Sequence, residues 1–205
     1  MFRPENNQLE PNLTSDFDLL SLIANRYGPL PADHAHTVKL FGAREFELQN
    51  RTDLTLGLSY IGRSGSPLNY LGAHYAYGPS ESFILPRGSA GRLDWVHSID
   101  AHAGLRYRLS SDYQLSVGAD IFNLFNFQTP TAVDQNYTFA TVRPIEGGTP
   151  ADLNTCDAPD PTQRTQCRLQ NFDGTPFSGT KNPNFLKPTA YQPPRSFRFT
   201  ARLTF

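Results

Sequence analysis

Five segments of the chain contain no proline, and apolar and polar residues alternate along them, more loosely in the first, where Arg44 falls on the apolar side. They cover residues 37–48, 53–63, 94–109, 114–126 and 195–205. In the last segment the apolar set is Phe197, Phe199, Ala201, Leu203 and Phe205. Alternation with a period of two is typical of a β-strand with one apolar and one polar face, and proline is excluded from sheet interiors. The pattern therefore predicts five strands.

The lengths of these segments and of their connections indicate the kind of sheet. The segments run from 11 to 16 residues, whereas strands of soluble proteins centre on about 5–6 residues and strands of membrane barrels need about 9–11. Short polar turns at 49–52 and 110–113 alternate with long stretches at 64–93 and 127–194 that are irregular and rich in proline and glycine. Short turns on one side and long loops on the other are typical of outer-membrane β-barrels.

We therefore predict an all-β fold: an antiparallel transmembrane β-barrel segment of about five long strands, with short periplasmic turns and long extracellular loops. Residues 1–36 would form a further outer loop. Five strands are too few to close, because bacterial single-chain barrels begin at about eight strands. The predicted barrel is thus incomplete, and a soluble β-sheet protein is the alternative.

The composition excludes several other classes. Eighteen Lys and Arg against 19 Asp and Glu give a formal net charge of −1, so no basic surface predicts nucleic-acid binding. No apolar run approaches the roughly 18–20 residues of a membrane-spanning helix. The first residues also lack the basic start and apolar stretch of a secretory signal.

Four segments carry a resemblance to a known family. They are residues 27–42 (YGPLPADHAHTVKLFG), 60–67 (YIGRSGSP), 115–126 (LSVGADIFNLFN) and 195–205 (RSFRFTARLTF). The third is similar to the penultimate-strand motif of TonB-dependent outer-membrane receptors, and the fourth resembles their last strand, which ends in an aromatic residue. The second is similar to the S-G-x-P of a strand-to-loop exit in that family, and the first resembles the lead-in of its Oar-like subgroup.

This resemblance implies a C-terminal fragment of a receptor with about 22 strands and an N-terminal plug. The intact parent would bind and import a ligand across the bacterial outer membrane. Its partners would be outer-membrane lipid, the barrel-assembly machinery, the remaining strands and plug, and TonB through that plug. The resemblance also implies a recognition signal for the assembly machinery in Phe197, Phe199, Leu203 and Phe205. An aromatic residue at the membrane interface is the simpler role for Phe205.

The polar face of the predicted strands would line the lumen of such a barrel. The lumen-facing residues are expected to be Asp100, His102, Arg106, Asp120, Arg198 and Arg202. Nothing converges on catalysis, because no nucleophile, base and orienting group occur in a recognisable arrangement. We expect no enzyme activity, no cofactor and no metal site.

The long loops supply the remaining candidates. Cys156 and Cys167 are the only cysteines; they would form a disulfide in an oxidising compartment, with free thiols as the alternative. Loop aromatics that would face a ligand are Tyr70, Tyr75, Tyr77 and Phe83. That ligand is an unidentified small molecule, peptide or saccharide. Two other functions are compatible with the pattern: a surface or adhesion protein that does not transport, and a soluble secreted β-domain that binds carbohydrate through these tyrosines and Trp95.

Overall fold

The computed structural model describes residues 19–49 and 51–205, so the first half of the predicted outer loop 1–36 lies outside the described residues. The chain divides into two compact units. The sheet unit comprises His34–Gly65, Asp94–Thr131 and Tyr191–Phe205. The loop unit comprises residues 19–33, Ser66–Leu93 and Ala132–Ala190. Each unit is built from segments that are far apart in the sequence.

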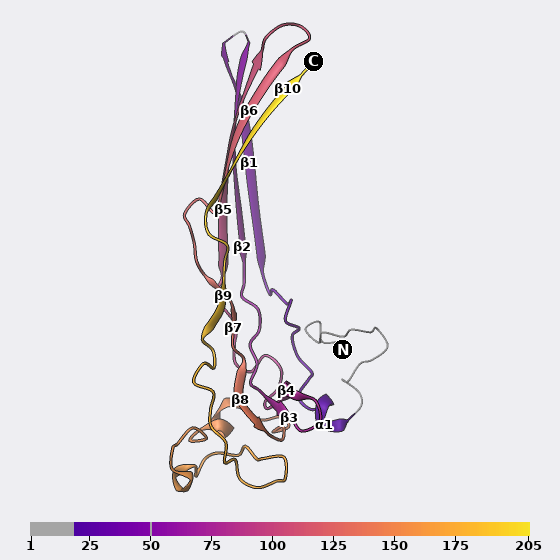
Figure 1. Ribbon diagram of the computed structural model, residues 1–205, viewed down its shortest axis with the longest axis vertical. Coiled ribbons are helices and arrows are strands. Elements are labelled where there is room, and N and C mark those ends of the chain that lie inside the picture. Colours follow the sequence, from indigo (N-terminus) through magenta and orange to yellow (C-terminus); the bar gives the residue numbers. More distant parts are fainter. Residues whose placement is uncertain (1–18, 50) are drawn as a thin grey trace. The chain divides into compact units, whose positions relative to one another are not determined.

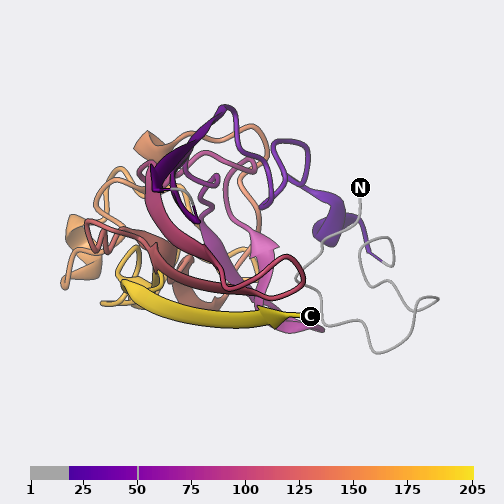
Figure 2. The ribbon, with the colours of Figure 1, turned by 90° about the horizontal axis from the view of Figure 1, so that it is seen from above.

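The sheet unit is one five-stranded antiparallel sheet in the order β1-β2-β5-β6-β10 (Figure 1). Its strands are β1 (Thr37–Gln49), β2 (Thr52–Arg63), β5 (Val96–Arg108), β6 (Gln114–Phe122) and β10 (Ser196–Thr204). Seen from above, β6 and β10 are curved ribbons, as the natural twist of strands requires (Figure 2). The sheet is open, with β1 and β10 at its edges. The predicted fold class, all-β and antiparallel with an incomplete barrel, is confirmed.

The register of the sheet separates apolar from polar side chains. Leu54 lies opposite Leu105, and Leu105 lies opposite Val117 on the next strand. One position along, Asp53 lies opposite Arg106. Because successive side chains point to opposite faces, these rows repeat along the sheet and give one mainly apolar and one mainly polar face. In β1 the separation is incomplete, because Arg44 lies opposite Leu56 on the apolar face. The apolar face is open: Leu58 is 55% exposed and Phe199 is 79% exposed.

The hydrophobic core of the described residues belongs to the loop unit. Every buried apolar side chain among them falls within its three segments. The central cluster is Ile84, Leu85, Tyr137, Val142, Leu153, Cys156, Leu169 and Phe177. The sheet unit therefore contributes no apolar side chain to a core, although it holds the longest strands of the chain.

The loop unit corrects the expectation that the two long connections are irregular. Its principal element is a three-stranded sheet in the order β4-β3-β8, formed by β3 (Leu71–His74), β4 (Gly78–Phe83) and β8 (Asn136–Thr141). Around it lie α1 (Leu20–Ile23) and two 3-10 helices, Pro150–Leu153 and Pro161–Gln163. Strands β7 (Pro130–Val133) and β9 (Pro188–Tyr191) pair separately. Strands of four to six residues are too short to show an alternating pattern.

Polar contacts and a covalent bond complete the loop unit. The side-chain amide of Asn25 donates to the carbonyls of Phe83, Ile84 and Ile145 at 2.9–3.2 Å. These bonds hold the first described segment against the core. Cys156 and Cys167, 11 residues apart, are joined by a disulfide whose first sulfur is completely buried in that core. Both features fix chain that would otherwise have few apolar contacts.

A buried histidine links α1 to the short sheet. His74 at the end of β3 is 3% exposed, and its Nε2 lies 2.9 Å from the Ser21 hydroxyl in α1. Its Nδ1 accepts the Ala76 backbone N–H at 3.2 Å, which requires that this nitrogen carries no proton. Burial lowers the pKa of His74, with Glu81 opposing that shift and Arg26 adding to it.

We predict that reduction of the Cys156–Cys167 disulfide lowers the free energy of unfolding of the loop unit by about 3 kcal/mol, because it releases a short ring in the unfolded chain. Hydrogen exchange followed by mass spectrometry measures this as faster exchange in peptides from β8 and the segment after it. Peptides from β5 provide the internal control. Unchanged protection around Cys156 after reduction would contradict the prediction.

We also predict that the loop unit loses stability in acid through His74. Its folded pKa lies below the unfolded value of about 6.5, so the unfolded state binds the proton more readily. The contribution is complete above pH 6.5 and is lost as the pH falls through the folded pKa. Urea denaturation at decreasing pH should show a decline in the free energy of unfolding. The substitution His74→Gln should remove this decline, whereas His36→Gln, which replaces an exposed histidine, should leave it unchanged. An equal decline in the free energy of unfolding of the His74→Gln chain would refute this prediction.

Candidate functional site on the polar face of the sheet

The six residues predicted to face a lumen lie on the polar face of the sheet. In the register, His102 of β5 is opposite Asp120 of β6, and Asp120 is opposite Arg198 of β10. Arg106 and Arg202 flank the same residue, Ser116, from β5 and β10. The sixth residue, Asp100, lies opposite Ser59 and accepts hydrogen bonds from Ser98 and the Asn123 backbone.

Three of these residues form an ion-pair cluster in the middle of the sheet. The Asp120 carboxylate accepts a hydrogen bond from His102 Nδ1 at 2.6 Å and another from Arg198 Nε at 2.9 Å. Its side chain is 13% exposed, whereas those of His102 and Arg198 are largely open. One carboxylate therefore holds a side chain from each neighbouring strand, the His102 ring on β5 and the Arg198 guanidinium on β10.

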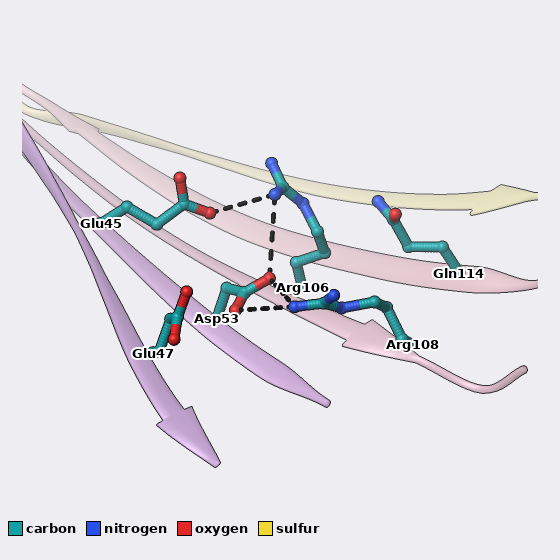
Figure 3. Close-up of a pocket in the computed structure, with 6 residues that line it drawn as sticks. All are labelled: Glu45, Glu47, Asp53, Arg106, Arg108 and Gln114. Atoms are coloured by element: carbon teal, nitrogen blue, oxygen red, sulfur yellow. Dashed lines mark hydrogen bonds and ion pairs between the residues drawn. The ribbon is translucent and has the colours of Figure 1, made fainter. Parts of the chain in front are cut away.

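A second cluster lies toward the short turns (Figure 3). Arg108 contacts both carboxylate oxygens of Asp53 at 3.1 and 3.2 Å. Arg106 bonds Glu45 at 3.0 Å and lies 3.8 Å from Asp53. The Asp53 side chain is only 7% exposed, and in Figure 3 its carboxylate lies between the two guanidinium groups. The residues of this cluster line a cavity of about 410 Å³, and Glu47 and Gln114 complete its lining.

Between the clusters the polar face is hollowed. Gly104 of β5 and Gly118 of β6 lie opposite each other, and the hollow above them measures about 600 Å³. A Cβ atom at Gly118 would come within 2.8 Å of the Thr200 hydroxyl. Glycine inside a strand often marks a close approach of another group. Arg202 borders the hollow and forms no ion pair with another described residue.

This arrangement presents fixed charges of both signs along a hydrated surface. Charged side chains that line a pore select and guide polar solutes. The described part of the chain contains no group of three or more His, Cys, Asp or Glu placed to hold a metal ion. No helix within the described ranges has the length and apolar character needed to cross a membrane.

The sequence patterns did not single out five of the six residues that line the cavity of the second cluster. Glu45, Glu47, Asp53, Arg108 and Gln114 sit on the polar side of their strands, but alternation says nothing about which of them meet. The register between β2 and β5 brings Asp53 beside Arg106. These two strands are joined by the long connection 64–93, so no short turn fixes their register and the contact could not be derived from the sequence.

The structure separates the four loop aromatics that were expected to face a ligand. Phe83 is a correction: it is 2% exposed, and the Arg26 and Arg87 guanidinium groups lie over its ring, so it packs within the loop unit. Tyr75 stacks on Phe172 with ring centroids 3.9 Å apart, and Tyr77 packs on His74. Tyr70 lies half-buried beside a cavity.

The proposed assembly residues lie along the edge strand β10 or directly after it. Phe197 lies opposite Ile121 and Leu203 opposite Leu115, which places both on the apolar face with Phe199. Phe205 follows the last residue of β10 and is exposed. Their role as a recognition signal remains a prediction from the resemblance.

We predict that Asp53→Asn lowers the free energy of unfolding of the sheet by about 1–2 kcal/mol, because it leaves two neighbouring guanidinium groups without their shared carboxylate. The partners are half-exposed, which keeps the loss below that of a fully buried pair. Thermal unfolding in detergent micelles measures the loss. Glu47→Gln is the matched control, because Glu47 lines the same cavity without an ion pair to a described residue. Equal effects of both substitutions would contradict the assignment.

Comparison with known proteins identifies one relationship. No family model matches the chain, and no solved structure matches it. The chain is 48% identical over all 205 residues to the TonB-dependent transporter Oar of Myxococcus xanthus. It spans 19% of the length of that transporter. The resemblance inferred from the four motifs is thereby confirmed: over its whole length the chain is related to a TonB-dependent transporter of the Oar type.

Proposed function

We propose that the sheet unit forms part of the wall of an outer-membrane barrel and that the barrel imports a ligand. The observation that carries this proposal is the apolar face of the sheet, which is open while the core of the described residues lies in the loop unit. Contiguous exposed apolar patches larger than a few hundred Å² are rare on soluble proteins and mark surfaces for lipid or a partner. The face runs across all five strands, with Arg44 of β1 as a charged exception.

Contact with lipid hydrocarbon is lower in free energy for this apolar face than contact with water. Each Å² of apolar surface removed from water contributes about 25 cal/mol. On the other side, paired charges such as Asp120 with Arg198 require water or a polar partner. A sheet with these two faces fits between hydrocarbon and a hydrated lumen. The bacterial outer membrane is the compartment that matches.

The open edges of the sheet specify what must accompany it. Unpaired backbone groups of β1 and β10 would each cost several kcal/mol in hydrocarbon. Further strands are therefore needed to close the wall, and we propose that they come from a longer receptor, together with a plug that contacts TonB. Assembly machinery would recognise the strand that ends at Phe205. In this scheme the polar face guides the ligand and no enzymatic step is involved.

One observation favours a second function. The loop unit has its own core and disulfide, so it resembles an independent binding body more than a set of loops. A surface or adhesion protein that does not transport would use this unit alone. The two functions differ in one respect: adhesion does not need the polar face of the sheet.

We predict that substitution by arginine disrupts membrane assembly at one position of β2 and is tolerated at the next. The test uses the Myxococcus xanthus transporter with its matching segment replaced by this sequence, since the two align over the whole chain. Leu58→Arg places a charge on the apolar face and should cost about 2–4 kcal/mol near the bilayer midplane. Ser59→Arg points to the polar face, beside Asp100, and should be tolerated.

Recovery of folded protein in the outer-membrane fraction is the measurement, by its resistance to urea extraction and its shift on heating. The unsubstituted chimera is the positive control. If Leu58→Arg assembles as well as Ser59→Arg does, the apolar face does not meet lipid and the barrel proposal fails.

A further inference from the structure

A cavity within the loop unit has the features of a ligand site. It measures about 430 Å³, a volume within the usual range for small-molecule pockets. All the residues that line it come from the loop unit. Two of its walls come from segments about 80 residues apart, around Tyr70 and around Asn154.

Three aromatic rings form the floor of this cavity. Tyr70 lies 5.1 Å from Phe185 and 5.9 Å from Tyr137, between ring centroids, and Tyr137 and Phe185 meet edge to face at 5.4 Å. Tyr137 is 3% exposed and belongs to the core. Burial, with a smaller effect of Asp157, raises its pKa to about 12, so its ring stays neutral. The floor is thus aromatic and uncharged.

The rim carries polar groups whose charges cancel. Lys181 Nζ lies 3.3 Å from the Asp157 carboxylate and 5.7 Å from the centre of the Tyr137 ring. The side-chain amide of Asn154 borders the cavity and makes no hydrogen bond to another described residue. A compensated ion pair beside the Asn154 amide favours a neutral ligand with many hydroxyl groups over a strongly charged one.

The backbone of the rim is held in costly conformations. Thr155 has φ of 60° and Leu186 has φ of 62°, both in the left-handed region that favours glycine. For a β-branched residue such as Thr155 this is a clear outlier, and such outliers cluster at ligand clamps. The disulfide at Cys156 lies between Thr155 and Asp157 and fixes this part of the rim. The site is therefore pre-organised before any ligand arrives.

We propose that this cavity binds a neutral saccharide unit. A pyranose ring has an apolar face that can lie on Tyr70 and Phe185, and hydroxyl groups at its edge that can bond Asn154, Asp157 and Lys181. The proposal goes beyond the transport function, since every residue in it belongs to the loop unit and none requires the sheet to lie in a membrane.

The test titrates the 205-residue chain, with its disulfide formed, with glucose, N-acetylglucosamine, maltose and cellobiose. Saturation-transfer NMR detects contact and isothermal titration calorimetry gives the affinity. We expect saturable binding of at least one saccharide. Asp157→Asn should weaken it about tenfold, the loss expected for a hydrogen bond to a charged group. Glu146→Gln is the matched control, because Glu146 is exposed in the same unit and outside the cavity.

Asn154→Ala provides a second variant whose folding is safe, because the Asn154 side chain is exposed. It should also weaken binding. Trialanine tests a peptide as the occupant. The proposal is overturned if no saccharide binds saturably to folded chain, if Glu146→Gln weakens binding as much as Asp157→Asn, or if trialanine binds in preference. Failure of the membrane chimera would leave these results unaffected, so the two proposals fail separately.

Discussion

The removal from water of one apolar sheet face is the constraint on which the rest of the molecule depends. Five strands present this face, and the core of the described residues contains none of its side chains. A soluble sheet would bury the face against a second layer. Here the residues that form a core lie in the long connections between the strands of the sheet unit. The sheet thus relies on an apolar surrounding, and the loop unit is stabilised as a small globular body.

The polar face has the opposite requirement, because its charged side chains need water or a partner of opposite charge. Asp53 and Asp120 are the least exposed carboxylates of their clusters, and each is paired with at least one guanidinium group from a neighbouring strand. Such pairs hold long side chains in place across the sheet and leave the glycine-lined hollow between them open. A wall that guides a solute needs fixed charges and free space together. The chain provides both within β2, β5, β6 and β10.

Sequence patterns predicted the sheet well because four of the five strands carry a clear alternation; only β1 is looser, with Arg44 on its apolar side. The face of Arg106 or Leu203 followed directly from its neighbours along the chain. The loop unit was missed for a physical reason: strands such as β3 and β8 are too short for a period, and they pair in parallel across more than 60 residues. Phe83 was misjudged likewise, since no local pattern distinguishes a core aromatic from a ligand contact.

The most direct test of the account measures which solvent each face of β2 meets. Nitroxide labels placed singly at residues 54–60 of the chimera in lipid bilayers report collisions with oxygen, which concentrates in hydrocarbon, and with a nickel chelate, which stays in water. The account predicts alternation of both values with a period of two and opposite phase, with oxygen highest at Leu54, Leu56, Leu58 and Tyr60. Oxygen and nickel values that rise and fall together would show that both faces meet the same solvent and would contradict it.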